Sequence, residues 1–202
     1  MKATEDIVAV ILAAGESKRM GTPKQLLPWQ NTTMLGHTLK VAKSVFDDEV
    51  FVVLGANYDS IRISEGVNDS NLIFNPNYKK GQGSSLSAGM ACIARQKKSY
   101  GGVLLMLCDQ PLITVDYIIQ LKKTFLKSNK GIVATKYEKN AGVPALFNHK
   151  YFNEMKNVES DTGAKKIIAE NINDTLLLDA QGKELDIDTK DEYEFLRSKL
   201  KL

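Results

Sequence analysis

Four short apolar runs in the first half of the chain constrain its fold more than any other feature. They are IVAVIL (7–12), EVFVVL (49–54), NLIF (71–74) and GVLLML (102–107). Short apolar runs without alternation are typical of strands buried on both faces, and such strands occur in parallel sheets. Segments with helical periodicity lie between them, at 32–46, 84–98 and 114–128. This alternation predicts a Rossmann-like, three-layer α/β/α fold with a mostly parallel sheet and right-handed crossovers.

The pattern changes after residue 130. Two strands are expected at 131–137 and 143–148, joined as a hairpin or a sheet extension, and a short helix is expected to begin at Asp161. Late strands at 175–180 and 185–188 and a closing helix at 190–200 complete the prediction. We interpret residues 1–202 as one domain, with a core over about 1–130 and a part over about 131–202 that completes the sheet.

Composition excludes several classes of protein. The chain has 202 residues, 43% of them hydrophobic and 25% charged, and its net charge of +3 is too small to indicate nucleic-acid binding. Two cysteines without a CxxC or Cys/His cluster argue against a disulfide framework and a structural zinc site. The apolar run near the start is too short for a signal peptide or a membrane span. We therefore expect a cytoplasmic protein without nucleic-acid or membrane partners.

A small and basic loop follows the first predicted strand. Ala13, Ala14 and Gly15 have little or no side chain, so a ligand can approach their backbone closely. Backbone amides in such a loop can face phosphate oxygens, and Arg19 and Lys24 add charged donors. The glycine spacing matches neither a Walker A loop nor a dinucleotide fingerprint. A solvated turn is the alternative, but this many features in one loop at a strand end favour a polyphosphate site.

Carboxylates follow two later segments. Asp109 comes after the strand at 102–107, where it would face the cleft, and Mg²⁺ sites typically use one or two carboxylates with substrate phosphates. The alternative is that Asp109 caps the turn before the helix at Thr114. Asp186 and Asp188 alternate along an extended segment, so Asp188 is a candidate second metal ligand. Asp188 or Thr189 could instead be the N-cap of the last helix.

The segment KKGQGSSLSAGM (79–90) has two compatible interpretations. Gly81 and Gly83 predict a flexible loop, and Ser84 or Ser85 could cap the helix that follows. The same residues could also contact a ligand, and Asn75, directly after the third predicted strand, would lie near them.

Several motifs together resemble one family. LAAGESKRMGTPKQLLP (12–28) is similar to the signature of the MobA-like nucleotidyltransferases, and most similar to the molybdenum-cofactor cytidylyltransferases among them. The resemblance continues with NPNYKKGQGSSLSAGM, LCDQPLI, GVPALF, DTGAKKII and DIDTKDEY, so it covers nearly the whole chain. It implies a fold of the nucleotide-diphospho-sugar transferase type, with the acceptor on the side of residues 131–202.

The resemblance also implies a reaction and its site. CMP would pass from CTP to the phosphate of molybdopterin, with Mg²⁺ or Mn²⁺ as cofactor, pyrophosphate as product and a molybdoenzyme as a candidate partner. Lys24, Arg19 and Asp109 would be catalytic, and Asp109 and Asp188 would bind the metal. The expected nucleotide-binding residues are Leu12, Ala13, Ala14, Gly15, Arg19, Lys24, Gln25, Asn75, Gly83, Ser84, Ser85 and Asp109.

Two further functions remain open at this stage. The same scaffold could serve a molybdopterin guanylyltransferase or an enzyme that acts on a sugar or polyol phosphate. A carrier or chaperone of the molybdenum cofactor, without catalysis, is the alternative from another class. The residues by themselves do not choose the nucleotide base.

Overall fold

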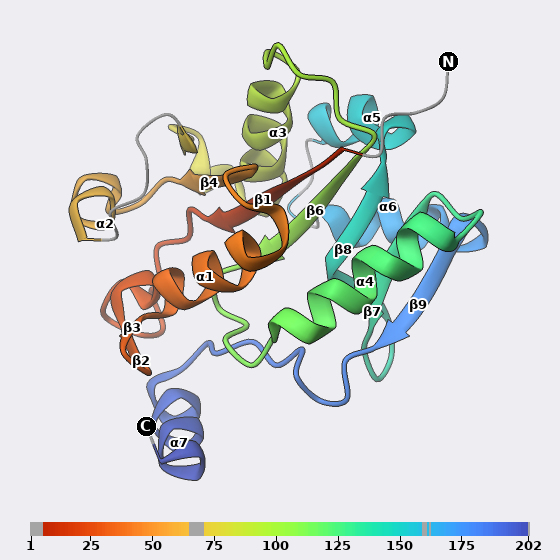
Figure 1. The fold of residues 1–202 in the computed structure, drawn as a ribbon. Helices are drawn as coiled ribbons and strands as arrows, with labels where there is room; N and C mark the ends of the chain where they lie inside the picture. The colour runs from red at the N-terminus through yellow and green to blue at the C-terminus, as the bar shows by residue number, and fades with distance from the viewer. Residues whose placement is uncertain (1–5, 65–70, 159–160, 162, 202) are drawn as a thin grey trace.

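The computed structural model describes residues 6–64, 71–158, 161 and 163–201. Its main sheet has seven strands in the order β5-β4-β1-β6-β8-β7-β9 (Figure 1). The strands are β1 (Ile7–Ala13), β4 (Val50–Leu54), β5 (Leu72–Phe74), β6 (Gly102–Leu107), β7 (Ile132–Lys136), β8 (Ala141–Asn148) and β9 (Thr175–Asp179).

Strand direction is uniform except at β8. β1 pairs in parallel with β4 and β6, β4 with β5, and β7 with β9, whereas β8 runs antiparallel to both β6 and β7. The carboxyl ends of the parallel strands therefore meet at one edge of the sheet, and β8 begins at that edge. The mostly parallel Rossmann-like sheet predicted from the sequence is confirmed, with the segment after residue 130 forming a hairpin that extends it.

Helices cover both faces of the sheet. They are α1 (Met34–Phe46), α2 (Tyr58–Ser64), α3 (Gln82–Ile93), α4 (Val115–Lys127), α5 (Phe152–Lys156), α6 (Ala164–Glu170) and α7 (Lys190–Leu200). Short 3₁₀ turns are η1 (Lys24–Leu26), η3 (Tyr78–Lys80), η4 (His149–Tyr151) and η5 (Ile172–Asp174), and a small hairpin pairs β2 (Pro28–Trp29) with β3 (Thr32–Thr33).

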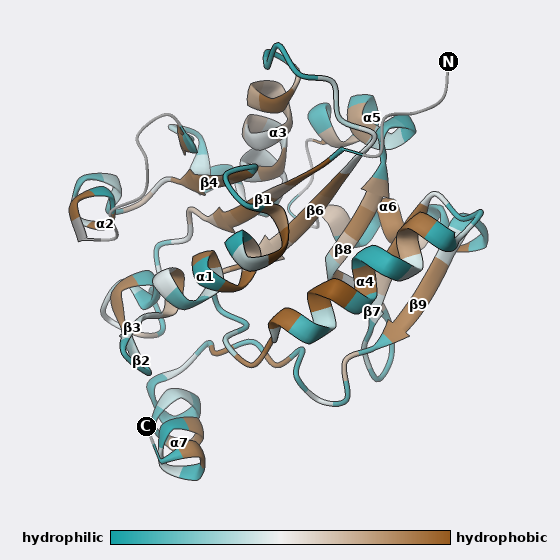
Figure 2. Cartoon of the chain, viewed as in Figure 1, coloured by the Kyte–Doolittle hydropathy of each residue, from teal (hydrophilic) through white to brown (hydrophobic). Residues whose placement is uncertain are grey.

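The alternation of side chains in β1 divides the core into two layers. Ile7, Ala9 and Ile11 pack in one cluster with residues of α1 and α4, while Val8 and Val10 pack in another with residues of α3, α5 and α6. Every residue of β1 is buried, as expected for a strand covered on both faces. The central strands are accordingly apolar along their length (Figure 2).

A third, smaller apolar cluster lies at the end of the chain. It joins α7 to the segment after β1, and its members are Met20, Trp29, Met34, Ile187, Tyr193 and Leu196. Ile187 and Met20 both belong to this cluster, so the segment before α7 lies next to the loop after β1. The C-terminal segment thus reaches back to the N-terminal half of the sheet.

Several predicted boundaries were wrong. Residues 185–188 form no strand. They belong to an irregular segment, called the crossing segment below, that runs past the carboxyl end of β6 on its way to α7 (Figure 1). Gly83, Ser84 and Ser85 belong to α3 itself rather than to a preceding loop or its cap: the helix begins at Gln82, and its N-cap, Gly81, makes no side-chain capping bond. The helix ends at Ile93, so the predicted segment at 84–98 runs past its observed end.

Three capping predictions have clear outcomes. Thr114 caps α4 by accepting a hydrogen bond from Tyr117 N, as predicted. Thr189, rather than Asp188, caps α7 and forms a capping box with Glu192. The helix expected to begin at Asp161 begins at Ala164, with Gly163 as N-cap at a φ of 52°. Thr162, part of the same motif, lies outside the described residues.

Candidate nucleotidyltransferase site

The loop after β1 is held in place by one buried amide. Gln25, only 1% exposed, donates from Nε2 to the carbonyl oxygens of Ala13 (2.8 Å) and Gly15 (3.0 Å). Lys24 N donates to Ser17 Oγ at 3.0 Å, which closes the loop onto η1. Leu26 and Leu27 pack against two different apolar clusters and anchor the end of the loop. The loop is therefore ordered by its own side chains.

Lys24 joins two carboxylates from distant parts of the chain. Its Nζ lies 2.7 Å from Asp109 Oδ2 and 2.9 Å from Asp188 Oδ1, and it also donates to Ile187 O at 3.1 Å. Arg19 Nη2 lies 2.8 Å from the other oxygen of Asp188. Ile187 N in turn donates to Asp109 O at 2.9 Å, so backbone and side chains both fix the crossing segment above β6.

The charges of this cluster shift one another's pKa values. Burial disfavours the charged form of Lys24, but the negative charges and hydrogen bonds of Asp109 and Asp188 outweigh it and raise the Lys24 pKa. Burial also acts on Asp188, yet Lys24 and then Arg19 lower the pKa of its carboxyl. Both shifts favour the charged forms, so Lys24 and Asp188 form an ion pair at neutral pH.

One oxygen in the cluster has no partner. Asp109 Oδ1 is buried and accepts no hydrogen bond within the part of the chain that the structure describes. A buried carboxylate oxygen without a donor is costly, and it is a suitable ligand for a hard divalent cation. Asp109 and Asp188 both contact the Lys24 ammonium, so their carboxylates lie close together. Two carboxylates placed in this way fit a Mg²⁺ or Mn²⁺ ion. No group of three or more His, Cys, Asp or Glu side chains suited to a metal occurs among the described residues.

A cavity of about 210 Å³ lies beside this cluster. Its lining joins the loop after β1, the start of α3 and the end of β6: Leu12, Ala14, Gly15, Lys24, Gln25, Tyr78, Gly81, Gln82, Ser85, Cys108 and Asp109. A Cβ placed on Gly15 would meet nothing within 4 Å, so the loop leaves open space at this point. A bulky ligand can approach the backbone there, as the small residues of the loop predict.

The other residues predicted to bind the nucleotide lie at several positions near this cavity. Asn75 Nδ2 donates to Ser84 Oγ (3.0 Å) and Ser85 Oγ (3.1 Å), and Asn75 and Ser84 line an adjacent cavity of about 590 Å³. Ala13 lies on the buried side of the loop, and Gly83 is buried in the first turn of α3. Arg19 is at the surface, with a side chain 68% exposed. The structure thus gathers the predicted residues at one edge of the sheet.

A buried glutamine was missed as a site residue by sequence reasoning. Gln110, 3% exposed, directly follows Asp109 and is absent from the residues expected to form the site. Its Nε2 lies 2.6 Å from Tyr137 Oη, 2.8 Å from Asp186 Oδ1, 3.2 Å from Val143 O and 3.3 Å from Glu184 O. This amide therefore ties the β7–β8 hairpin to the segment that carries Asp188. Its one signal in the sequence is that a polar residue, Gln110, directly follows Asp109 at the end of a buried strand.

Asp186 lies in the same network. Much of the residue is exposed, but its carboxylate rests against Gln110, and burial together with the charge of Asp109 raises the Asp186 pKa. The sequence places Asp186 and Asp188 on the same side of an extended segment, with Asp188 as the candidate metal ligand. The structure gives them different partners: Asp188 meets Lys24 and Arg19, and Asp186 meets Gln110.

The fold and the site define a nucleotidyltransferase-type α/β protein. The sequence profile of the MobA-like NTP transferase domain matches residues 9–175, and the chain belongs to this family. The "Purine catabolism protein PucB" of Bacillus subtilis is 29% identical, over 95% of this chain and 96% of that protein. The "Molybdenum cofactor cytidylyltransferase" of Escherichia coli is 26% identical, over 93% of each.

A solved structure shares the whole fold. The crystal structure of Rv0371c from Mycobacterium tuberculosis H37Rv superposes with a TM-score of 0.81 at 32% identity, covering 97% of this chain and 98% of that one. A second structure of the same protein, in complex with manganese, gives a TM-score of 0.75 at 29% identity, covering 95% and 97%. Family and fold together establish a nucleotidyltransferase scaffold. In the part of the chain that the structure describes, no helix is both long and apolar enough to cross a membrane.

Proposed function

We propose that this chain transfers CMP from CTP to the phosphate of molybdopterin and releases pyrophosphate. The observation that carries the proposal is the convergence of Lys24, Arg19, Asp109 and Asp188 at the carboxyl edge of the sheet, beside a loop that leaves space for a nucleotide. Ligands of open α/β sheets bind at this edge. The cytidylyltransferase relative from Escherichia coli supports cytosine as the base and molybdopterin as the acceptor.

The proposed reaction is an in-line displacement. An oxygen of the acceptor phosphate forms a bond to the α-phosphorus of CTP, and the bond from that phosphorus to the bridging oxygen of the β-phosphate breaks. The electron pair leaves with pyrophosphate. A phosphate monoester is already ionised near neutral pH, so the site needs no general base. Positioning and charge stabilisation are then the main tasks of the protein.

The cations have separate roles in this scheme. Lys24, with a side chain only 13% exposed, is fixed near the strand ends and would stabilise negative charge on the α-phosphate. Arg19 is exposed and is held by a single carboxylate, so it is free to turn toward the β- and γ-phosphates and the departing pyrophosphate. Ala14 and Gly15 admit the nucleotide to the strand end. Gln25 shapes that loop from beneath.

Asp109 and Asp188 would hold a divalent cation, Mg²⁺ or Mn²⁺. The unpartnered Asp109 Oδ1 supports this assignment, and the manganese complex of the Mycobacterium tuberculosis relative is consistent with it. When bound, such an ion neutralises charge on nucleotide phosphate oxygens. Lys24 balances the two carboxylates and keeps them together.

The test uses purified protein with CTP, molybdopterin and Mg²⁺, and it measures pyrophosphate together with the dinucleotide product. Lys24→Ala and Asp109→Asn should each lower turnover about 10²–10³-fold, the usual cost of losing one preorganised charge stabiliser. Lys98→Ala is the matched control, since Lys98 forms ion pairs with Asp6 and Glu49 away from the candidate site. Circular dichroism checks that each variant is folded. The proposal fails if both site variants keep the turnover of the control.

A second measurement is needed to identify the nucleotide base and to distinguish an enzyme from a carrier. A ligand that binds only the folded protein raises its unfolding temperature, so CTP should stabilise the protein more than GTP, ATP or UTP in the presence of Mg²⁺. A preference for GTP would indicate a guanylyltransferase, and a preference for UTP with activity on a sugar phosphate would indicate a sugar-nucleotide enzyme. Binding of molybdopterin without release of pyrophosphate would indicate a carrier.

A further inference from the structure

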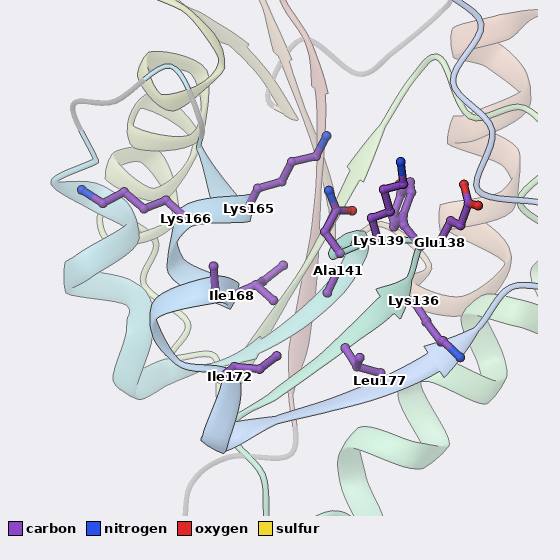
Figure 3. A pocket seen from close by; sticks show the side chains of 12 residues that line it. Lys136, Glu138, Lys139, Ala141, Lys165, Lys166, Ile168, Ile172 and Leu177 are labelled. Atoms are coloured by element: carbon purple, nitrogen blue, oxygen red, sulfur yellow. The ribbon is translucent and has the colours of Figure 1, made fainter.

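A large cavity lies beside the β7–β8 hairpin (Figure 3). Its volume is about 830 Å³, within the range of small-molecule sites. The cavity is bounded by three parts of the chain: the hairpin turn after β7, α6 together with Ile172 just beyond its end, and the edge strand β9.

The cavity has an apolar floor and a cationic rim. Ile168, Ile172 and Leu177 gather around its centre in Figure 3, with Ala141 next to them. Ile172 is 51% exposed and Leu177 40%, so these two side chains face solvent, whereas Ile168 is only 1% exposed and belongs to the core. Lysines dominate the charged lining, which contains Lys136, Lys139, Lys165, Lys166 and a single acid, Glu138.

Lys165 stands where the cavity meets the candidate site. Its Nζ lies 6.0 Å from the centre of the Tyr137 ring, and Tyr137 Oη lies 2.6 Å from Gln110 Nε2, on the residue next to Asp109. Lys136 ends β7 and Ala141 begins β8, so this part of the cavity opens at the same sheet edge as the Lys24 cluster.

We propose that this cavity binds the acceptor, a phosphate monoester joined to a flat ring system, with Lys165 holding the phosphate and the apolar floor holding the rings. The proposal rests on the proposed function and assigns residues to its acceptor. It follows from the order of the groups: a cation stands nearest to Asp109, and the apolar surface lies behind it. An acceptor bound in this direction presents its phosphate oxygen toward the α-phosphorus of the nucleotide.

The charge pattern favours an anionic occupant over a second copy of this chain. The chain has a net charge of +3, and four lysines surround the cavity against one glutamate. Lys165 is also held over an aromatic ring, which fixes its position before a ligand arrives. A phosphate entering there gains a charge-assisted hydrogen bond with little loss of side-chain freedom.

The first experiment compares a lysine of the cavity with one outside it. Lys165→Ala should raise the KM for molybdopterin about ten- to a hundredfold, the size expected for one charged hydrogen bond, and should leave the CTP-induced thermal shift unchanged. Lys123→Ala removes the same charge from an exposed residue of α4 that is outside the cavity lining. Its KM should stay within about twofold of wild type, below what one charged hydrogen bond contributes. Equal effects of the two variants would overturn the role of Lys165.

The second experiment compares adjacent leucines of β9. Leu177→Asp puts a charge on the cavity floor, whereas Leu176→Asp puts it on a neighbour of nearly equal exposure (40% and 39%) that is outside the cavity lining. Molybdopterin binding is followed by the fluorescence of its own ring system, without CTP. We expect Leu177→Asp to weaken binding at least about tenfold more than Leu176→Asp, since an unpaired charge would face the rings.

The outcomes separate the two proposals. Wild-type protein that binds molybdopterin but forms no dinucleotide from CTP contradicts the proposed function, while selective loss of binding in Leu177→Asp still supports the cavity. Wild-type protein that forms the dinucleotide, with Leu177→Asp and Leu176→Asp equal in binding and in KM, overturns the cavity proposal alone. In that case the apolar floor would serve another occupant, such as a helix of a partner protein.

Discussion

At the scale of single residues, two glycines on either side of the nucleotide loop meet different requirements. A Cβ on Gly55 would lie 2.5 Å from Tyr78 Cβ and 2.8 Å from Ala14 O, so the backbone after β4 can pack against the loop only without a side chain. A Cβ on Gly15 would meet no protein atom within 4 Å. Gly55 therefore serves the fold, and Gly15 serves whatever enters the cavity beside it.

This difference predicts opposite effects of two alanine substitutions. Gly55→Ala should lower the free energy of unfolding by about 1–3 kcal/mol, because it forces a contact into a packed region. Gly15→Ala should change it by no more than about 0.5 kcal/mol, yet weaken CTP binding about tenfold by occupying the nucleotide's approach. Urea denaturation and a CTP titration measure the two quantities. Equal CTP affinity of Gly15→Ala and wild type would contradict a nucleotide in this loop.

Individual residues differ in how well the sequence revealed their positions. Lys24 and Asp109 follow buried strands, and parallel strands end at a common edge, so their proximity could be predicted. The partners of Gln110 could not, because they come from the β7–β8 hairpin and from the segment before α7. Nothing in local sequence places those two segments beside each other. The position of Lys165 next to Tyr137 depends on the same tertiary packing.

At the scale of elements, α7 locks the crossing segment onto the start of the chain. Tyr193 Oη donates to Pro28 O at 2.6 Å, and Leu196 packs in the cluster that contains Trp29. The helix also begins directly after Asp188, through the cap at Thr189. Docking of α7 therefore fixes the direction from which Asp188 reaches Lys24.

Trp29 allows this docking to be measured. It is the single tryptophan of the chain and is 1% exposed, so its fluorescence reports on the cluster. Leu196→Ala should lower the free energy of unfolding by about 2–3 kcal/mol and shift the emission of Trp29 to longer wavelength as α7 loosens. Phe195→Ala is the control, because Phe195 is 63% exposed on the same helix, and its effect should stay within about 0.5 kcal/mol. Unchanged emission in Leu196→Ala would show that α7 does not hold the cluster together.

Elements were easier to predict than their ends. The four strands of the first half were found at or within a residue of their observed bounds, because each is an uninterrupted apolar run. β1, β4 and β6 are buried as such runs predict, whereas β5 is an edge strand and only partly buried. The start of α3 was misplaced, because the favoured capping residues Ser84 and Ser85 hydrogen-bond to Asn75 and the helix begins at Gln82 without a side-chain cap. Residues 185–188 alternate like a strand but pair with no strand of the sheet, and the backbone of Ile187 bonds instead to Asp109 O and Lys24 Nζ. Alternation alone does not show which partner a segment will find.

At the scale of the whole molecule, charges from distant segments converge on one edge of the sheet. Lys24, Asp109, Asp186 and Asp188 supply both positive and negative charge there. The cluster favours the ionised form of some of these groups and disfavours the ionised form of others. Asp188 gains from Lys24 and Arg19, so its pKa is lowered. Asp186 faces burial and the charge of Asp109, so its pKa is raised. The two carboxylates lie two residues apart but affect stability in opposite directions.

Opposite pKa shifts give opposite pH profiles. A lowered folded-state pKa means that Asp188 stabilises the fold above the ordinary aspartate pKa of about 4, and that this contribution is lost as the pH falls through its folded value. A raised folded-state pKa means that ionised Asp186 costs stability above its folded value and nothing below about pH 4. Asp188→Asn should therefore be less stable than wild type at neutral pH, and Asp186→Asn more stable, with both differences shrinking in acid.

Urea denaturation across the acid to neutral range, with a chelator to remove divalent ions, measures these differences. Asparagine keeps an acceptor oxygen for Gln110 or Lys24, so each comparison isolates the charge. Differences of the same sign for the two variants would show that the cluster does not separate its carboxylates in this way. Opposite signs would mean that the metal-free protein keeps Asp188 ionised beside Lys24 and Arg19 at neutral pH, in the state that a divalent cation requires of its ligand.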